Sequence, residues 1–239
     1  MKVLLIGANV ASTPYYVYPL GLSMIASALK NAGHEARQFD FLKNQMSVES
    51  IEKEIRLFLP DIIGISLRNI DNVNFMNNQR YLDAVKEIVR KIRHVTEAPV
   101  VMGGSGFSIM PEAILKEVGA DHGIVGEGES LMVQFADNAA KGMYPEKGCI
   151  RSSDHMKGHD IPSACYDPDI MEFYLKSGNI ASVQTKRGCT HKCVYCSYPV
   201  LEGSVIRPRN PVSVADDIET LIDAHKASYI FFHGFGFQR

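Results

Sequence analysis

The chain has few cysteines, little net charge and no long apolar segment. Each of these features excludes a class of protein. No apolar run among the 239 residues reaches the roughly 18 that a membrane span requires. The net charge of −2 does not indicate a nucleic-acid surface. The first apolar run, Lys2 to Gly7, is too short for a signal peptide and lacks a small-residue cleavage site. An odd number of cysteines, five, is not typical of a disulfide framework. These absences predict a globular protein of the reducing cytoplasm.

Three of the five cysteines, Cys189, Cys193 and Cys196, lie close together with the spacing C-x3-C-x2-C. Thiolates are soft ligands that suit iron–sulfur clusters and zinc. Three thiolates on one short loop can bind three irons of a [4Fe-4S] cluster and leave the fourth iron open to a small molecule. The alternative is a structural zinc site with Cys165 or His191 as fourth ligand. Zinc sites usually combine two separated Cys/His pairs, so the spacing favours the cluster.

The first 141 residues alternate strand and helix patterns. Short apolar runs predict strands at 2–6, 61–67, 99–102 and 122–125, and residues 35–39, just before Asp40, are interpreted as a further strand. Amphipathic patterns predict helices at 19–31, 47–59, 80–94, 111–117 and 130–140. Buried strands that alternate with helices indicate an α/β fold with a five-stranded, parallel, Rossmann-like or flavodoxin-like sheet. Ligands of such sheets bind at the carboxyl ends of the strands, here at loops 8–19, 67–78, 103–110 and 126–130.

The remaining residues divide into two parts. Residues 142–178 contain glycine, proline, serine and histidine without a regular period, which predicts a linker. Residues 179–239 are interpreted as a second domain that carries the cysteine loop. We expect a strand at 180–184, a helix at 213–224 with Ser213 as N-cap, and a strand at 229–232.

The order of several short motifs resembles that of cobalamin-dependent radical S-adenosylmethionine (SAM) enzymes. They are Pro19-Leu20-Gly21-Leu22, Gly33-His34-Glu35, Gly103-Gly104, Gly126-Glu127-Gly128-Glu129, Thr185-Lys186-Arg187-Gly188-Cys189 and the C-x3-C-x2-C loop. The resemblance covers residues 1–232 and implies cobalamin in the first domain, with a [4Fe-4S] cluster and SAM at the cysteines. The classical D-x-H-x-x-G loop is absent, and residues 7–18 contain no histidine. We therefore expect cobalamin to bind without a histidine ligand to cobalt.

The resemblance also implies roles for individual residues. The three cysteines would bind the cluster, and Tyr195, just before the last of them, would stack near the adenine of SAM. The expected cobalamin residues flank the nucleotide tail, and they are Ser66, Leu67, Gly103, Gly104, Gly126 and Gly128. The glycines have an alternative explanation, since tight turns also select them. No catalytic residue is assigned.

Weaker hypotheses concern charged and aromatic residues. Asp40 contacts a ribose or, more commonly, stabilises a turn. The tyrosines at 15, 16 and 18 cover a corrin face or pack between domains. Four basic residues are expected on a solvated surface, and they are Lys186, Arg187, Arg207 and Arg209.

The activity implied by the resemblance is reductive SAM cleavage coupled to methyl transfer or related radical chemistry at an unactivated carbon. It requires an electron donor and an unidentified small-molecule or lipid substrate. Two alternatives remain: a cobalamin-binding module with a vestigial cluster loop, and a flavodoxin-like domain with a zinc-knot interaction segment.

The second domain has room only for a strand, a helix and a strand, so we expect an incomplete radical SAM partial (β/α) barrel. An incomplete barrel leaves a bare strand edge that favours oligomers, and this short chain is expected to be inactive. The family pattern F-x-D-x-x-F-N becomes the sequence from Phe232 onward if one thymine is inserted. The hypothesis is a truncated or frameshifted enzyme, which the coding DNA tests.

Overall fold

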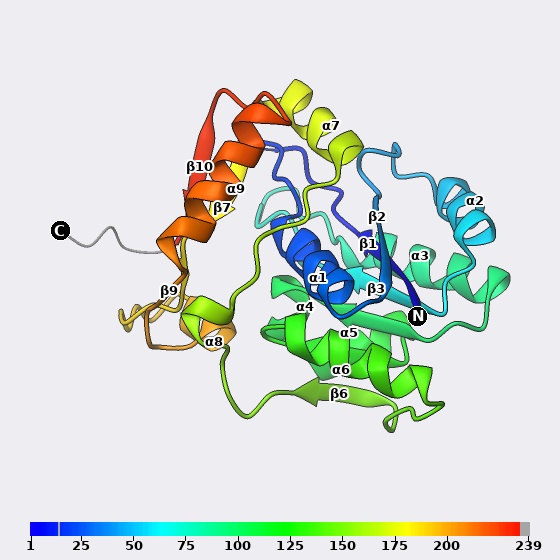
Figure 1. The fold of residues 1–239 in the computed structure, drawn as a ribbon. Helices are drawn as coiled ribbons and strands as arrows, with labels where there is room; N and C mark the ends of the chain where they lie inside the picture. Colours follow the sequence, from blue (N-terminus) through cyan, green and yellow to red (C-terminus); the bar gives the residue numbers. More distant parts are fainter. Residues whose placement is uncertain (14, 235–239) are drawn as a thin grey trace.

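A parallel sheet of six strands organises the first two thirds of the chain in the computed structural model, which describes residues 1–13 and 15–234 (Figure 1). The strands are β1 (Lys2–Gly7), β2 (Glu35–Asp40), β3 (Ile62–Ser66), β4 (Val100–Gly103), β5 (His122–Val125) and β6 (Gly148–Arg151). Their order is β2-β1-β3-β4-β5-β6, and every neighbouring pair is parallel. The order reverses between β1 and β3, which places a ligand-binding crevice at their carboxyl ends.

Helices cover both faces of this sheet. One face carries α1 (Leu20–Asn31) and α6 (Glu129–Ala140), and the other carries α2 (Val48–Phe58), α3 (Leu82–Val95) and α5 (Pro111–Val118). Successive residues of β1 alternate between the two resulting cores, because side chains of a strand point to opposite faces. Leu4 packs toward α2 and α3, whereas Leu5 packs toward α1 and α6. Both cores consist of buried apolar side chains, so the central strands are continuous apolar segments of the sequence.

The prediction of five strands and of a domain boundary at residue 141 was wrong in one respect. The sixth strand, β6, lies inside the predicted linker and pairs with β5 at the edge of the sheet. Its four residues are only half-buried or exposed and include Arg151. An edge strand this short has no apolar run, so the sequence carried no signal for it. A short helix, α4 (Ser105–Ile109), was also not predicted.

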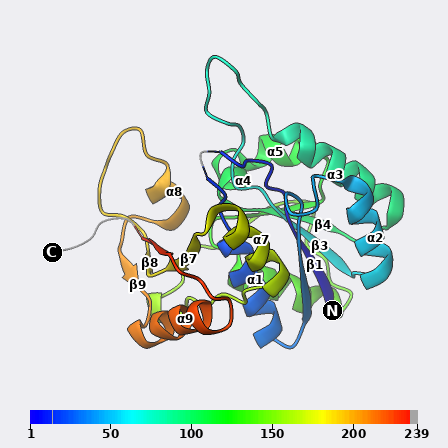
Figure 2. The same ribbon diagram turned by 90° about the horizontal axis from the view of Figure 1, so that it is seen from above.

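The second module packs against the carboxyl end of the sheet (Figures 1 and 2). Strands β7 (Ala181–Gln184) and β10 (Ile230–His233) pair in parallel, and β8 (Lys186–Arg187) and β9 (Arg207–Pro208) pair antiparallel. Its helices are η1 (Gly158–Asp160), α7 (Pro168–Gly178), α8 (Tyr198–Glu202) and α9 (Pro211–Asp223). Among the described residues, β10 has β7 as its one strand neighbour.

Helix α9 begins at Pro211, two residues before the predicted N-cap Ser213. Asn210 caps it instead, because its side-chain oxygen accepts a hydrogen bond from the Val212 N–H at 2.9 Å. Pro211 then occupies the first turn, where its missing N–H costs nothing. The helix predicted from residue 47 is α2, and Ser47 is its N-cap, because the Ser50 N–H donates to the Ser47 hydroxyl at 3.2 Å.

An aromatic core joins the sheet to the second module. Tyr18 is 1% exposed and packs with Tyr166 and Tyr174, which come from the segment after β6. The Tyr18 hydroxyl also bonds Ser23, at 2.7 Å. The tyrosine group before α1 therefore serves packing between the two parts of the chain, which was one of the two expected roles.

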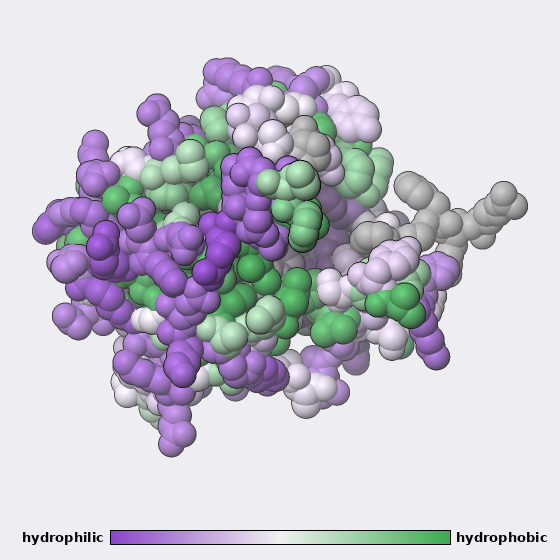
Figure 3. All heavy atoms as spheres, turned by 180° about the vertical axis from the view of Figure 1, so that it is seen from behind, coloured by the Kyte–Doolittle hydropathy of each residue, from purple (hydrophilic) through white to green (hydrophobic). Residues whose placement is uncertain are grey.

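The predicted asparagine-rich loop after β3 is confirmed and projects from the molecule (Figure 2). Val73, Phe75 and Met76 at its tip are each at least 90% exposed. Elsewhere, apolar side chains alternate with polar ones on the face seen from behind (Figure 3). No described helix combines the length and apolar character needed to cross a membrane.

Candidate functional site

A cavity of about 530 Å³ lies between the carboxyl ends of the strands and the second module. Its volume falls within the range of about 300–1,000 Å³ of small-molecule sites. The sheet contributes Gly7, Ser66 and Gly103, and α1 and α6 contribute Leu22, Ile25 and Met132. The second module contributes Gln184, Arg187, Tyr198, Leu201, Glu202 and His233. The cavity therefore belongs to both parts of the chain and lies at the switch in strand order.

Five of the six residues predicted to flank cobalamin line this cavity. They are Ser66, Gly103, Gly104, Gly126 and Gly128. The side chain of the sixth, Leu67, does not line the cavity, because it is 1% exposed and packs in the core toward α2 and α3, and its place beside cobalamin remains a prediction. One residue further along an extended chain points to the opposite face, so Ser66 and Leu67 separate.

Gly104 and Gly126 differ in the physical reason for having glycine at that position. Gly104 has φ +96°, and a Cβ there would lie 2.5 Å from the Leu67 carbonyl oxygen. The close approach of two backbones alone therefore demands glycine at 104. Gly126 has φ +82°, but a Cβ there would meet nothing nearer than 3.7 Å. The space beside Gly126 is open to a ligand, although its positive φ by itself also favours glycine there.

Gly64 is a lining residue that the sequence analysis missed. It lies in the middle of β3, and a Cβ there would be 2.8 Å from Leu5 Cδ2 and 3.7 Å from Met132 Cε. Any side chain would thus fill the floor of the cavity between the sheet and α6. A glycine inside an otherwise apolar central strand often marks the close approach of a ligand, and that signal was present in the sequence.

Arg68 and Asn69 were also missed as lining residues. They follow β3 directly, within a loop that was predicted to lie at the ligand-binding edge. Strand β2, on the other side of β1, ends at Asp40, which is fully buried and accepts hydrogen bonds from the Lys43 N–H at 2.7 Å and the Tyr174 hydroxyl at 3.0 Å. Burial raises the pKa of Asp40 to about 6. Asp40 does not line the cavity, so the turn role expected for it fits the structure.

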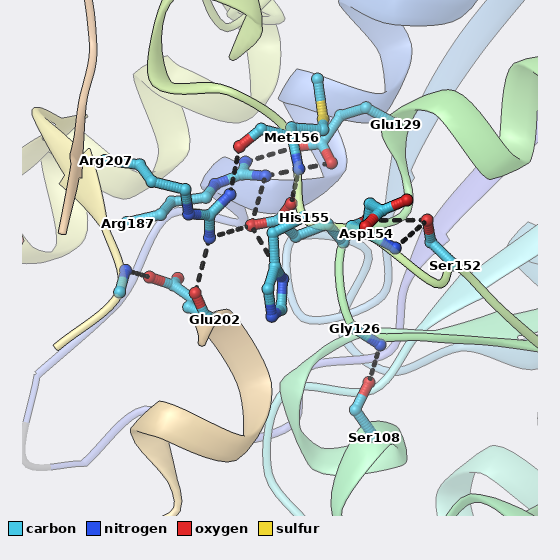
Figure 4. Close-up of polar contacts among 12 residues, drawn as sticks. Ser108, Gly126, Glu129, Ser152, Asp154, His155, Met156, Arg187, Glu202 and Arg207 are labelled. Carbon is cyan, nitrogen blue, oxygen red and sulfur yellow. Dashed lines mark hydrogen bonds and ion pairs between the residues drawn. The ribbon is translucent and has the colours of Figure 1, made fainter. Parts of the chain in front are cut away.

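A buried network of charges closes the cavity on the side of the second module (Figure 4). Arg187 donates from Nη1 and Nη2 to the two carboxylate oxygens of Glu129, and their side chains are 6% and 4% exposed. Nη1 also lies 3.8 Å from Glu127. Bidentate contact of this kind fixes both distance and orientation. The expectation that Arg187 is solvated was wrong, because the carboxylates that bury it come from a distant loop.

Arg207 extends the network from strand β9. It donates to Glu127 at 2.5 Å and to the carbonyl oxygens of Met156 and Glu202, each at 2.5 Å. The Met156 N–H in turn donates to Glu127 at 2.8 Å. The predicted linker thus folds onto the site, and Arg207 was also wrongly expected to be solvated.

Burial and pairing act in opposite directions on the acids of the network. Burial raises the pKa of Glu127, but hydrogen bonds from Arg207 and the Met156 N–H outweigh it and leave the pKa below its usual value. Burial raises the pKa of Glu202, which accepts the Gly188 N–H at 3.2 Å. Glu127 is therefore the firmly anionic partner of the arginines.

The predicted metal-binding cysteines lie on the irregular segment between β8 and α8. Cys189 is buried, Cys196 is half-buried and Cys193 is exposed. The Cys189 N–H donates to the Gly203 carbonyl at 3.1 Å, which ties the start of the loop to the end of α8. Within residues 1–13 and 15–234, no three His, Cys, Asp or Glu side chains converge on a metal-binding point. The thiol chemistry suits a cluster, and the cluster ligands remain a prediction.

Two residues proposed beside the cysteines, Cys165 and Arg209, are bonded to other partners. Cys165, the candidate fourth zinc ligand, packs beside α1, where Lys30 Nζ donates to its sulfur at 3.1 Å. Tyr195 is 88% exposed, so its predicted place beside an adenine also remains a prediction. Arg209 is buried and paired with Asp217 at 2.8 Å, which corrects the last of the basic residues expected on the surface.

Fold and cavity define a class: a doubly wound cofactor-binding α/β domain joined to a cysteine-bearing module. Residues 6–136 match the B12 binding domain family, and the chain belongs to that family. The match covers the sheet from the end of β1 to α6 and includes all six predicted cobalamin residues.

Similar proteins extend beyond this domain. A tryptophan 2-C-methyltransferase of Streptomyces laurentii is 24% identical over 92% of the chain and 47% of its own length. An uncharacterized methyltransferase of Pyrococcus horikoshii is 29% identical over 85% of the chain and 45% of its own length. The chain thus spans about half the length of the curated relatives it matches.

Solved structures share the fold across both modules. The radical SAM methyltransferase TsrM from Kitasatospora setae, with tryptophan and a SAM analogue bound, superposes with a TM-score of 0.83 at 24% identity, covering 97% of this chain and 47% of that one. The cobalamin-dependent SAM radical enzyme OxsB with aqua-cobalamin bound gives 0.72 at 17% identity, covering 98% and 34%. The sheet and the second module are therefore arranged as in these folds.

Proposed function

We propose that this chain forms the cobalamin-binding and cluster-binding part of a cobalamin-dependent radical SAM methyltransferase. The observation that carries the proposal is the shared cavity, lined both by the carboxyl edge of a B12-binding sheet and by the module that bears the three cysteines. The names of the relatives, methyltransferases that include cobalamin- and SAM-dependent enzymes, support the same reaction class.

The residues of the cavity suit the nucleotide tail of cobalamin. Ser66 offers a hydroxyl at the end of β3, and Gly103 and Gly126 let the backbone come close to a ligand. The floor at Gly64 leaves room between the sheet and α6. These residues would hold the tail, and the corrin would then face the second module.

Cys189, Cys193 and Cys196 would hold the [4Fe-4S] cluster, and Tyr195 would lie at the adenine of SAM. When bound, these groups supply one-electron chemistry and a methyl carrier for transfer to an unactivated carbon. The chain's own residues bind and orient them, while Arg187 and Glu129 close the cavity beside the cysteine loop. An electron donor and a small-molecule or lipid substrate complete the proposal, and a cluster of this type needs the reducing cytoplasm.

Anaerobic purification with iron, sulfide and hydroxocobalamin tests the proposal. The expected result is one corrin and about four irons per chain, with the absorption of both groups. Triple replacement of Cys189, Cys193 and Cys196 by alanine should remove the iron and keep the corrin. The matched control replaces Cys149 and Cys165, which lie outside the loop, and should change neither. Absence of both groups from the wild-type chain would refute the proposal.

A second candidate is a cobalamin-binding module whose cysteine loop no longer holds a cluster. It is favoured by the exposure of Cys193 and by the scatter of the three thiols in the described chain. The same experiment separates the two candidates, since this one predicts corrin without iron. Stoichiometric zinc without corrin would instead support the zinc-knot alternative.

A further inference from the structure

One ion pair connects the two halves of the cavity wall. Glu129 is the first residue of α6 and directly follows the Gly126–Gly128 turn at the end of β5. Arg187 ends β8 and stands two residues before Cys189. Both side chains line the cavity, and both are at least 94% buried. The pair, drawn in Figure 4, therefore lies in the wall of the ligand space, and one of its members is two residues from the first cysteine.

The contact is rigid in two respects. Arg187 uses two nitrogens on the two oxygens of Glu129, and its Nε donates to the Gln184 side chain at 2.9 Å. A planar guanidinium held at three positions cannot rotate independently of its backbone. A displacement of the Gly126–Glu129 segment must then displace residue 187, or else leave a buried charge without its partner, which is strongly unfavourable.

The cysteine loop is tied to the same position. The Gly188 N–H donates to Glu202 at 3.2 Å, and the Cys189 N–H donates to the Gly203 carbonyl at 3.1 Å. Gly188 has φ +82°, and a Cβ there would lie 2.0 Å from the Val205 carbonyl oxygen, so the backbone at 205 packs directly against residue 188. Movement of Arg187 is therefore passed to Cys189.

We propose that the Glu129–Arg187 pair is a positioning contact that couples occupation of the cavity to metal loading at the cysteine loop. This inference builds on the proposed function, because it takes cobalamin as the cavity ligand and the cysteines as the metal site. A ligand against Gly126 and Gly128 selects one position of Glu129, and the ion pair carries that position to Cys189. By linkage, metal at the loop must change the affinity of the cavity by the same factor.

The coupling is measured by titrating hydroxocobalamin, anaerobically, into the full chain with and without reconstituted iron and sulfide. The ratio of the two affinities is the coupling factor, which we expect to lie between about 5 and 150 in the wild-type chain. Arg187→Lys, which cannot make the two-pronged contact, and Glu129→Gln should each bring the ratio close to one. Iron content and the cluster absorption of each variant are recorded separately, and circular dichroism confirms that each variant is folded.

Arg209 provides the matched control. It pairs with Asp217 at 2.8 Å, is as deeply buried as Arg187, and belongs to the same module, but it does not line the cavity. Arg209→Lys should keep the wild-type ratio. Equal losses in the Arg187 and Arg209 variants, or a wild-type ratio of one with both groups bound, would overturn the coupling and leave the proposed function intact. Failure of the wild-type chain to bind either group would overturn both.

Discussion

Replacement of Asp40 by asparagine is expected to stabilise the fold near neutral pH. Asp40 is fully buried at the carboxyl end of β2. Burial raises its pKa from 3.8 to about 6, although the Lys43 N–H and the Tyr174 hydroxyl both favour the charged form. Ionisation of this group therefore opposes folding. Asparagine keeps an acceptor oxygen for the Lys43 N–H, its amide group can donate to the oxygen of the Tyr174 hydroxyl, and it carries no charge.

The sign and size of the effect follow from proton linkage. Below pH 3.8 the carboxyl is protonated in both the folded and the unfolded chain, so it contributes no pH dependence. Between pH 3.8 and about 6 the unfolded chain ionises first, so the stability of the protein falls as the pH rises. The displacement corresponds to about 3 kcal/mol, since each pKa unit is worth about 1.4 kcal/mol. Above pH 6 the loss is complete.

Urea denaturation of the wild-type chain and of Asp40→Asn, at several pH values between about 4 and about 7, measures this contribution. The variant should be more stable by up to about 3 kcal/mol at neutral pH, and the difference should shrink toward pH 4. Tyr174→Phe removes a hydrogen-bond donor to Asp40 and should steepen the wild-type slope. Parallel pH curves for the wild-type chain and Asp40→Asn would show that the burial of Asp40 has no such cost.

Three further predictions follow from single residues. The pKa of Asp121 is shifted in the opposite direction, because hydrogen bonds from Lys147, the Val100 N–H and Arg93 outweigh burial and lower it to about 2. The ionised carboxylate therefore stabilises the fold, and Asp121→Asn should lower the free energy of unfolding by about 1–2 kcal/mol at neutral pH. In urea denaturation this difference should disappear as the pH falls toward 2. Gly104→Ala should lower the free energy of unfolding by about 3 kcal/mol. Gly119→Ala, at φ +72° with open space around it, should lower it by about 1 kcal/mol. Similar midpoints of the two variants in thermal melts would contradict this prediction. Gly64→Leu should fill the cavity floor and weaken hydroxocobalamin binding at least tenfold, about 1.4 kcal/mol, in a titration of folded protein, and unchanged affinity would place the ligand elsewhere.

Local patterns were sufficient for the architecture of the first domain. Four of the five predicted strands, β1, β3, β4 and β5, are mostly buried on both faces, so an apolar run marks each of them in the sequence, whereas the edge strand β2 is only partly buried. The capping residue Ser47 was equally readable, because the bond it makes is to a residue three positions away. The cluster of cysteines and the glycines at strand ends are local as well. For this reason the sequence alone indicated both the parallel sheet and the residues gathered at its edge.

Only the tertiary structure revealed the features that depend on residues distant in the sequence. Arg187 and Arg207 are charged residues that a sequence assigns to the surface, and only the carboxylates of the Glu127–Glu129 segment, some 60–80 residues away in the chain, bury them. Strand β6 exists because β5 offers it an edge, and Leu67 turns from the cavity because the strand before it sets the alternation of faces. Burial and ion pairing are properties of the folded neighbourhood, whereas strand and helix periodicity are properties of the chain, and this difference separates what could be predicted from what had to be observed.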